Sequence, residues 1–261
     1  MAIGSTIVGV ANGEICVTST ANASAKLTVV GQLLSSGVGV APIVTTRVLD
    51  SRISGKLAAN RSVTISPKAF GDVTGVQAVT VAFTILGPAA AGTLSVGPCG
   101  GTPLKAPFAR TSMWAFTAVL SVSAAGLCAS SSVATNLVID VDAVWLGNGP
   151  ALMPVKPVRI FDSRDLGQPV GATPVPVNVV GFDGAPSGVS AVAFNLTVLG
   201  GAAGGSVFVW PCEKPMPSSV VAAVAPNKRG TFSVVAAVSG GVLCVASNQP
   251  VTVIIDVTGV A

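Results

Sequence analysis

The chain carries short apolar segments that are broken at regular intervals by glycine, proline and serine. In the segment from Val76 to Leu86, apolar residues alternate at period two with small or polar ones, and the segment from Val189 to Leu199 has the same pattern. Such alternation places one set of side chains on a single face of a β-sheet. The pattern therefore predicts an all-β fold of antiparallel β-sandwiches, either jelly-roll or immunoglobulin-like.

A glycine- and alanine-rich tract follows each of these segments, over residues 87–92 and 200–205. Glycine reaches positive φ without strain, so such tracts are typical of turns. We expect residues 93–96 and 206–210 to return after the turns as the second strands of hairpins.

The chain also repeats itself. Residues 75–99 align without a gap with residues 188–212, and 13 of the 25 positions are identical. Matching segments before and after this block keep an offset of 112 to 116 residues. Such self-similarity indicates tandem structural units. We therefore predict two homologous sandwiches, here called the first module (residues 40–149) and the second module (residues 150–261).

Residues 1–39 resemble a partial repeat. The segments 13–17 and 27–30 match the last strands of the two modules, so we expect the C-terminal strands of a preceding module here. A few strands without a partner sheet are marginal in water. They could add to the sheet of the following module, which requires no second chain. Alternatively, they could complete a module in a neighbouring chain by strand addition, which would make the protein self-associate.

Charge and composition exclude several classes of function. Only 9% of residues are charged, the net charge is +4, and the basic residues are scattered, so no nucleic-acid-binding stripe is predicted. No stretch of about 18 residues is continuously apolar, so we expect no membrane insertion. Histidine and tyrosine are absent and acids are few. We therefore expect no enzyme activity, no cofactor and no metal site.

Four of the five cysteines recur in step with the repeat. In each module Pro-Cys, at Cys99 or Cys212, is followed about 30 residues later by Gly-x-Cys, at Cys128 or Cys244. The repeat predicts the disulfides Cys99–Cys128 and Cys212–Cys244 and leaves Cys16 without an intrachain partner. Buried reduced thiols are the alternative. Disulfides indicate an oxidising compartment, hence an extracellular or cell-surface location.

The motif Arg-Φ-Φ-Asp-Ser-Arg, in which Φ is apolar, is the most chemically distinctive feature. It comprises Arg47, Asp50 and Arg52 in the first module and Arg159, Asp162 and Arg164 in the second. Guanidinium and carboxylate groups can bind an anion or a sugar. They can equally form a structural brace at the end of a strand. We favour the brace, because both modules keep the motif.

Two further sets of residues have open alternatives. Asp140 and Asp256 lie inside apolar strands and need a partner. We expect a motif arginine in that role, and calcium is disfavoured because no dense Asp/Asn/Gly loop accompanies them. Trp114, Trp145 and Trp210 could stack on sugar rings, but core or inter-module packing is the stronger interpretation.

The order Arg-Φ-Φ-Asp-Ser-Arg, Gly-Val-x-Ala-Val, Pro-Cys, Gly-x-Cys, Ile-Asp-Val resembles tandem β-rich modules in large secreted surface proteins of actinobacteria. The resemblance covers nearly the whole chain and implies a secreted or surface context, with no catalytic residues to carry over. We therefore expect a structural or adhesive repeat protein: a segment of a filament, fibre, surface layer or adhesin stalk. Its partners would be neighbouring modules or further copies. The alternative is a carbohydrate-binding module for cell-wall or extracellular glycans.

Overall fold

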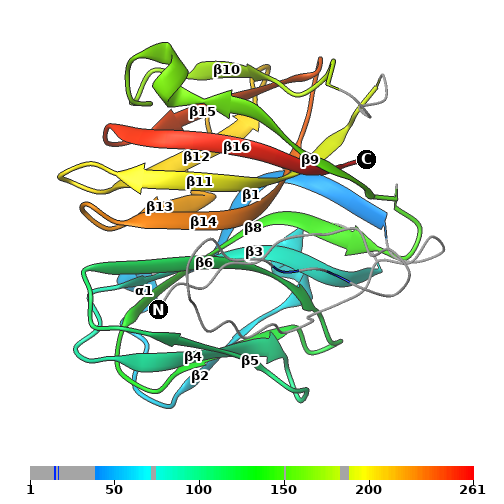
Figure 1. Ribbon diagram of the computed structural model, residues 1–261. Coiled ribbons are helices and arrows are strands. Elements are labelled where there is room, and N and C mark those ends of the chain that lie inside the picture. Colours follow the sequence, from blue (N-terminus) through cyan, green and yellow to red (C-terminus); the bar gives the residue numbers. More distant parts are fainter. Residues whose placement is uncertain (1–14, 16, 18–38, 72–74, 150, 183–187) are drawn as a thin grey trace.

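The computed structural model describes residues 15, 17, 39–71, 75–149, 151–182 and 188–261 (Figure 1). The predicted partial repeat over residues 1–39 lies almost entirely outside the described residues. Both predictions of how it packs lie outside them as well. The described residues form sixteen strands, and every pairing between strands is antiparallel. The fold is all-β, as the alternation of apolar and polar residues predicts.

The first module is a sandwich of two four-stranded sheets. Its inner sheet has the order β1 (Gly39–Asp50), β8 (Asn136–Leu146), β3 (Val76–Leu86) and β6 (Met113–Ser121). Its outer sheet has the order β2 (Ser62–Ile65), β7 (Leu127–Ser131), β4 (Gly92–Pro98) and β5 (Leu104–Phe108). Two short helical turns, α1 (Ser51–Ser54) and η1 (Pro67–Phe70), flank β2 along the chain.

The second module repeats this arrangement strand for strand. Its inner sheet has the order β9 (Met153–Asp162), β16 (Val251–Val260), β11 (Ala191–Gly200) and β14 (Arg229–Ala237). Its outer sheet has the order β10 (Val175–Asn178), β15 (Val242–Ser247), β12 (Gly205–Pro211) and β13 (Ala222–Val224). The turn η2 (Ser163–Leu166) follows β9, as α1 follows β1.

The strand order identifies each module as a jelly roll. Eight strands in the order 1-8-3-6 facing 2-7-4-5 form two interlocked Greek keys. An immunoglobulin-like sandwich would instead have seven to nine strands divided between the sheets in a different order. The topology thus decides between the two sandwich types that the sequence left open.

The predicted hairpins are wrong. The strand over Val76–Leu86 forms as expected, but it pairs with β8 and β6, whereas the following strand β4 pairs with β5 and β7. Residues 87–92 therefore carry the chain from one sheet to the other, and β11 and β12 are connected in the same way. Phe83 and Leu94 are both fully buried in one core. The two strands face each other across that core, because both have an apolar face to bury.

The four sheets stack in four layers, with the inner sheets of the two modules against each other (Figure 1). Each module has its own core between its inner and outer sheets. The central strands of the inner sheets are covered on both faces, and β8 is accordingly buried at every position from Leu137 to Trp145. This is why the inner strands have longer apolar runs than strict alternation allows.

A third apolar cluster lies between the inner sheets. It contains equivalent residues of the two modules: Val40 and Leu152, Ala78 and Ala191, Val119 and Val235, and Trp145 and Ala261. Between the same two sheets, the backbone N–H of Ser233 donates a buried 2.7 Å hydrogen bond to Oγ1 of Thr117, which occupies the equivalent position in the first module. The contact is therefore self-complementary, in the manner of the interface of a two-fold symmetric dimer.

Candidate functional site: the repeated arginine–aspartate clusters

The motif aspartates stand where the first strand of each module ends. Asp50 is the N-cap of α1, and its carboxylate accepts a 3.0 Å hydrogen bond from the backbone N–H of Arg52. Asp162 caps η2 in the same way, with a 3.1 Å bond from the backbone N–H of Arg164. In both modules the arginine side chain folds back so that its Nε donates to the same carboxylate at 2.8 Å. The motif thereby closes a tight turn.

The first arginine of the motif ties this turn to the neighbouring strand. Arg47 lies opposite Asp140 in the β1–β8 pairing. Its Nε and Nη2 reach the two carboxylate oxygens of Asp140 at 2.9 and 3.1 Å, a bidentate pair, while its Nη1 lies 3.4 Å from Asp50. One guanidinium therefore bridges two carboxylates on adjacent strands.

The second module has the same geometry. Arg159 Nε and Nη2 contact Asp256 at 2.8 and 3.3 Å, and its Nη1 lies 3.5 Å from Asp162. The structure thus brings together all eight charged residues that the sequence singled out, four in each module.

The motif serine has a role that the sequence analysis missed. The hydroxyl of Ser51 accepts a buried 2.8 Å hydrogen bond from the backbone N–H of Leu137, and Ser163 accepts one of 3.0 Å from Val253. Both hydroxyls satisfy a backbone donor at the start of the last strand of the module. The recurrence of serine in both motifs was the signal that could have revealed this role.

The pKa values of the cluster aspartates shift in opposite directions, because arginine hydrogen bonds lower them and burial raises them. Hydrogen bonds from Arg164 hold the pKa of Asp162 down at about 2, and hydrogen bonds from Arg52 lower that of Asp50. Burial raises the pKa of Asp140, and its ion pair with Arg47 offsets only part of this effect. The two capping carboxylates therefore favour the ionised form, whereas Asp140 carries a cost of desolvation.

The two clusters differ in their exposure to solvent. The side chain of Asp140 is 1% exposed and that of Asp256 is 27% exposed, and Arg47 and Arg159 are 27% and 51% exposed. The second module contributes to this difference, because the backbone N–H of Val220 lies near enough to Asp140 to favour its ionised form. The first cluster is therefore part of the contact between modules. This geometry favours the structural brace over an anion or sugar site.

Asp142 is a buried acid outside the clusters. It is 1% exposed, and neither carboxyl oxygen makes a hydrogen bond of normal geometry with a described residue. Burial, reinforced by the nearby Asp140, raises its pKa well above the ordinary value, and the hydroxyl of Thr45 counteracts this only weakly. The equivalent residue of the second module is Thr258, whose hydroxyl donates to the carbonyl of Ala193 at 3.3 Å.

Two disulfides join the pairs that the repeat predicts, Cys99–Cys128 and Cys212–Cys244, each with a Cα–Cα distance of 4.9 Å. Cys16 lies outside the described residues. Within the described part of the chain, no three His, Cys, Asp or Glu residues are grouped so that they could hold a metal ion. No helix among the same residues is long and apolar enough to cross a membrane.

The tryptophans are engaged in packing. Trp145 is buried between the modules and donates a 2.9 Å hydrogen bond to Thr80, and Trp210 is buried and donates to the carbonyl of Lys214 at 3.0 Å. Trp114 is half-buried beside two phenylalanines, with ring centroids 4.9 and 5.8 Å away. The structure therefore gives Trp145 and Trp210 the packing role and not that of sugar platforms.

No protein-family model matches the chain, and no curated protein matches its sequence. Among solved structures it is similar to the N-terminal CBM22-1-CBM22-2 tandem domain of Xyn10C from Paenibacillus barcinonensis, at 11% identity and TM-score 0.23, over 79% of this chain and 85% of that one. It is also similar to the STIV MCP, at 9% identity and TM-score 0.23, over 86% and 96%. A Parabacteroides distasonis protein described as secreted matches at 8% identity and TM-score 0.17, over 87% and 84%. Likenesses this remote assign no function.

Proposed function

We propose that the chain is a structural segment of a secreted or cell-surface repeat protein, in which a stiff pair of modules acts as a spacer in a filament, fibre, surface layer or adhesin stalk. The observation that carries this proposal is the shared apolar cluster between the inner sheets. A spacer must transmit force and keep its length, and two sandwiches that share a core cannot swing about a linker.

The charged clusters and the disulfides support the same role. Each bidentate arginine pair joins the first and last strands of its module, where a jelly roll would otherwise open. Each disulfide lies in an outer sheet and closes a loop across it. Two disulfides are also typical of proteins that work outside the cell. We infer an extracellular location from them.

Single-molecule force spectroscopy on the whole chain tests the spacer. We expect the chain not to extend before the modules unfold. When a module unfolds, the residues inside its disulfide loop should stay closed and should not add to the increase in length. Reduction should then add roughly 100 and 110 Å for the closed loops of 29 and 32 residues, at about 3.5 Å per residue. Gradual separation of the modules at low force, before either unfolds, would contradict the proposal. External protease acting on intact producing cells tests the location and should remove the chain.

The alternative, a carbohydrate-binding module that uses its tryptophans, has less support. Trp145 and Trp210 are buried and hydrogen-bonded inside the protein, so neither offers a free ring face. A sugar site on this chain has to be built from other residues.

A further inference from the structure

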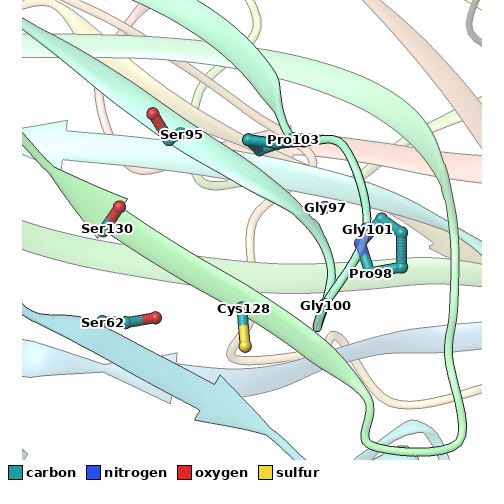
Figure 2. A pocket seen from close by; sticks show the side chains of 9 residues that line it. All are labelled: Ser62, Ser95, Gly97, Pro98, Gly100, Gly101, Pro103, Cys128 and Ser130. Atoms are coloured by element: carbon teal, nitrogen blue, oxygen red, sulfur yellow. The ribbon is translucent and has the colours of Figure 1, made fainter.

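The outer sheet of the first module has a shallow hollow on its solvent-facing side (Figure 2). Its volume is about 140 Å³. Three serines on three adjacent strands line its floor, and the loop after β4 forms one wall; the residues are Ser62, Ser130, Ser95, Gly97, Pro98 and Pro103. The hollow lies over the half-buried Cys128 of the first disulfide.

The strand register arranges these serines in a row. Ser62 lies opposite Ser130, Ser130 lies opposite Ser95, and Ser95 lies opposite Lys105 on the edge strand β5. Residues directly opposite each other project from the same face of a sheet. Lys105 is exposed and makes no ion pair with any described residue. The row of hydroxyls therefore ends in an exposed ammonium group.

No described carboxylate shares this face. The described acids of the first module are Asp50, Asp140 and Asp142, and all three belong to the inner sheet. The face consequently combines hydrogen-bonding hydroxyls with the positive charge of Lys105.

The jelly roll does not require these residues, as the second module shows. The repeat and the strand register match Ser95 with Phe208, Gly97 with Trp210, Ser130 with Ala246 and Lys105 with Val221. In the second module the indole of Trp210 is 3% exposed, and it stands at the position of Gly97 in the first. At Gly97 the backbone of Thr102 and Pro103 takes up the space beside the strand, so that a side chain there would meet Pro103 at 3.0 Å. Hydroxyls, hollow and lysine are thus properties of the first module alone.

We propose that this face binds an acidic polysaccharide, with one sugar residue seated in the hollow and its acid group on Lys105. Serine hydroxyls both donate and accept hydrogen bonds, as the hydroxyls of a sugar do. The ring faces of the two prolines offer apolar contact for the C–H groups of a sugar ring. The hollow is smaller than the roughly 300–1,000 Å³ of pockets that enclose a whole ligand, so the remaining chain lies along the row of serines.

The proposal does not depend on the spacer role and is tested separately, with polygalacturonate as the probe. Electrophoresis of the native chain through gels that contain polygalacturonate should retard it, whereas the fully methyl-esterified polymer, which has the same backbone without charge, should not. Equal retardation by both polymers, or by neither, would overturn the proposal.

Variants locate the site. Lys105→Val and Ser95→Phe introduce the residues of the second module. Lys105→Val should weaken binding about tenfold or more, which is the loss of one charge-assisted hydrogen bond. Ser95→Phe should weaken binding as well, because it removes a hydroxyl and places a ring in the hollow. Lys228→Val removes another exposed lysine, in the second module, and should leave the affinity unchanged. If Ser95→Phe lowers the melting temperature, the milder Ser130→Ala replaces it. If Lys105→Val and Lys228→Val weaken binding equally, the interaction depends only on net charge and the proposed site is refuted.

Discussion

At the scale of single residues, the aspartates of the inner sheets couple folding to pH with opposite signs. Asp50 and Asp162 have lowered pKa values, so their stabilising contribution is present above the ordinary aspartate pKa of about 4 and is lost as pH falls. Asp142 has a raised pKa, so the folded state binds its proton more tightly than the unfolded chain. Stability therefore declines as pH rises above about 4 toward the folded pKa of Asp142.

Replacing Asp142 by threonine, the residue at the equivalent position 258, tests this second effect. The variant should lose the part of the decline that Asp142 causes, while Asp140, whose pKa burial also raises, keeps its own smaller part. It should be about 1–3 kcal/mol more stable at pH 7, because an unpaired buried carboxyl is removed. Urea unfolding at several pH values between 4 and 8 measures both quantities. Parallel pH profiles for the parent and Asp142→Thr would show that Asp142 is not the titrating group.

The loss of stability at acid pH is assigned to the capping aspartates, Asp50 and Asp162. Asn is as good an N-cap as Asp. Asp162→Asn should therefore keep the η2 turn while removing the loss of stability between the ordinary pKa near 4 and the folded value of about 2. The readout is the slope of the unfolding free energy over pH 2 to 4, compared with that of the parent. An unchanged slope would assign acid sensitivity to other carboxylates.

The two bidentate pairs should differ in energetic weight. Asp140→Ala removes a fully buried partner and should cost about 3 kcal/mol, because polar groups in the contact between modules lose their acceptor. Asp256→Ala leaves the half-exposed Arg159 in contact with water and should cost about 1 kcal/mol or less. Urea unfolding at pH 7 measures the unfolding free energy of both variants. Equal losses of stability would contradict the conclusion that only the Arg47–Asp140 pair belongs to the contact between modules.

At the scale of the elements, inner and outer sheets are stabilised by different means. Inner strands have 9 to 12 residues, and the central ones, such as β3 and β8, are buried over most of their length. Outer strands have only 3 to 7 residues. Short strands provide few backbone hydrogen bonds and little buried area. Both disulfides lie in these weaker sheets, between the residue after β4 or β12 and the strand β7 or β15.

Removal of one disulfide should therefore destabilise its module substantially. Cys99→Ser combined with Cys128→Ser opens a loop of 29 residues and should cost about 3–4 kcal/mol in the chain-entropy model. Thermal unfolding without reductant measures the loss. With reductant, the parent should fall to the stability of a variant that lacks both disulfides. If the variant with both substitutions has the same melting temperature as the parent, the outer sheet is stable without its disulfide.

At the scale of the whole molecule, we expect the contact between inner sheets to make the two modules unfold as one unit. Ala193 lies fully buried in the shared cluster, and an arginine there would place an unpaired charge between the sheets. Ala193→Arg should split a single unfolding transition into two and enlarge the particle in small-angle scattering. Leu199→Arg, on the same strand but 37% exposed, is the control and should change neither. Two transitions in the parent itself would refute the single unit.

Several features could be derived from the sequence because they depend on local pattern or on the repeat. The strand over Val76–Leu86 follows from alternation, and the disulfide pairs follow from cysteines that recur in step. The engagement of Asp140 and Asp256 by arginine follows from the cost of an unpaired charge in an apolar strand. The first and last of these depend on burial rules that apply residue by residue, and the disulfides depend on the repeat alone.

Only the tertiary structure decided which strands share a sheet. A glycine-rich turn fits a hairpin and a crossing between sheets equally well, so the segment over residues 87–92 was predicted as a hairpin although it joins two sheets. The burial of Asp140 beyond that of Asp256, and the packing of Trp145 between modules, depend on which faces meet. Period-two alternation says that a face is buried but not what covers it, because many partners bury the same apolar area. That choice is made by the shape of the whole molecule.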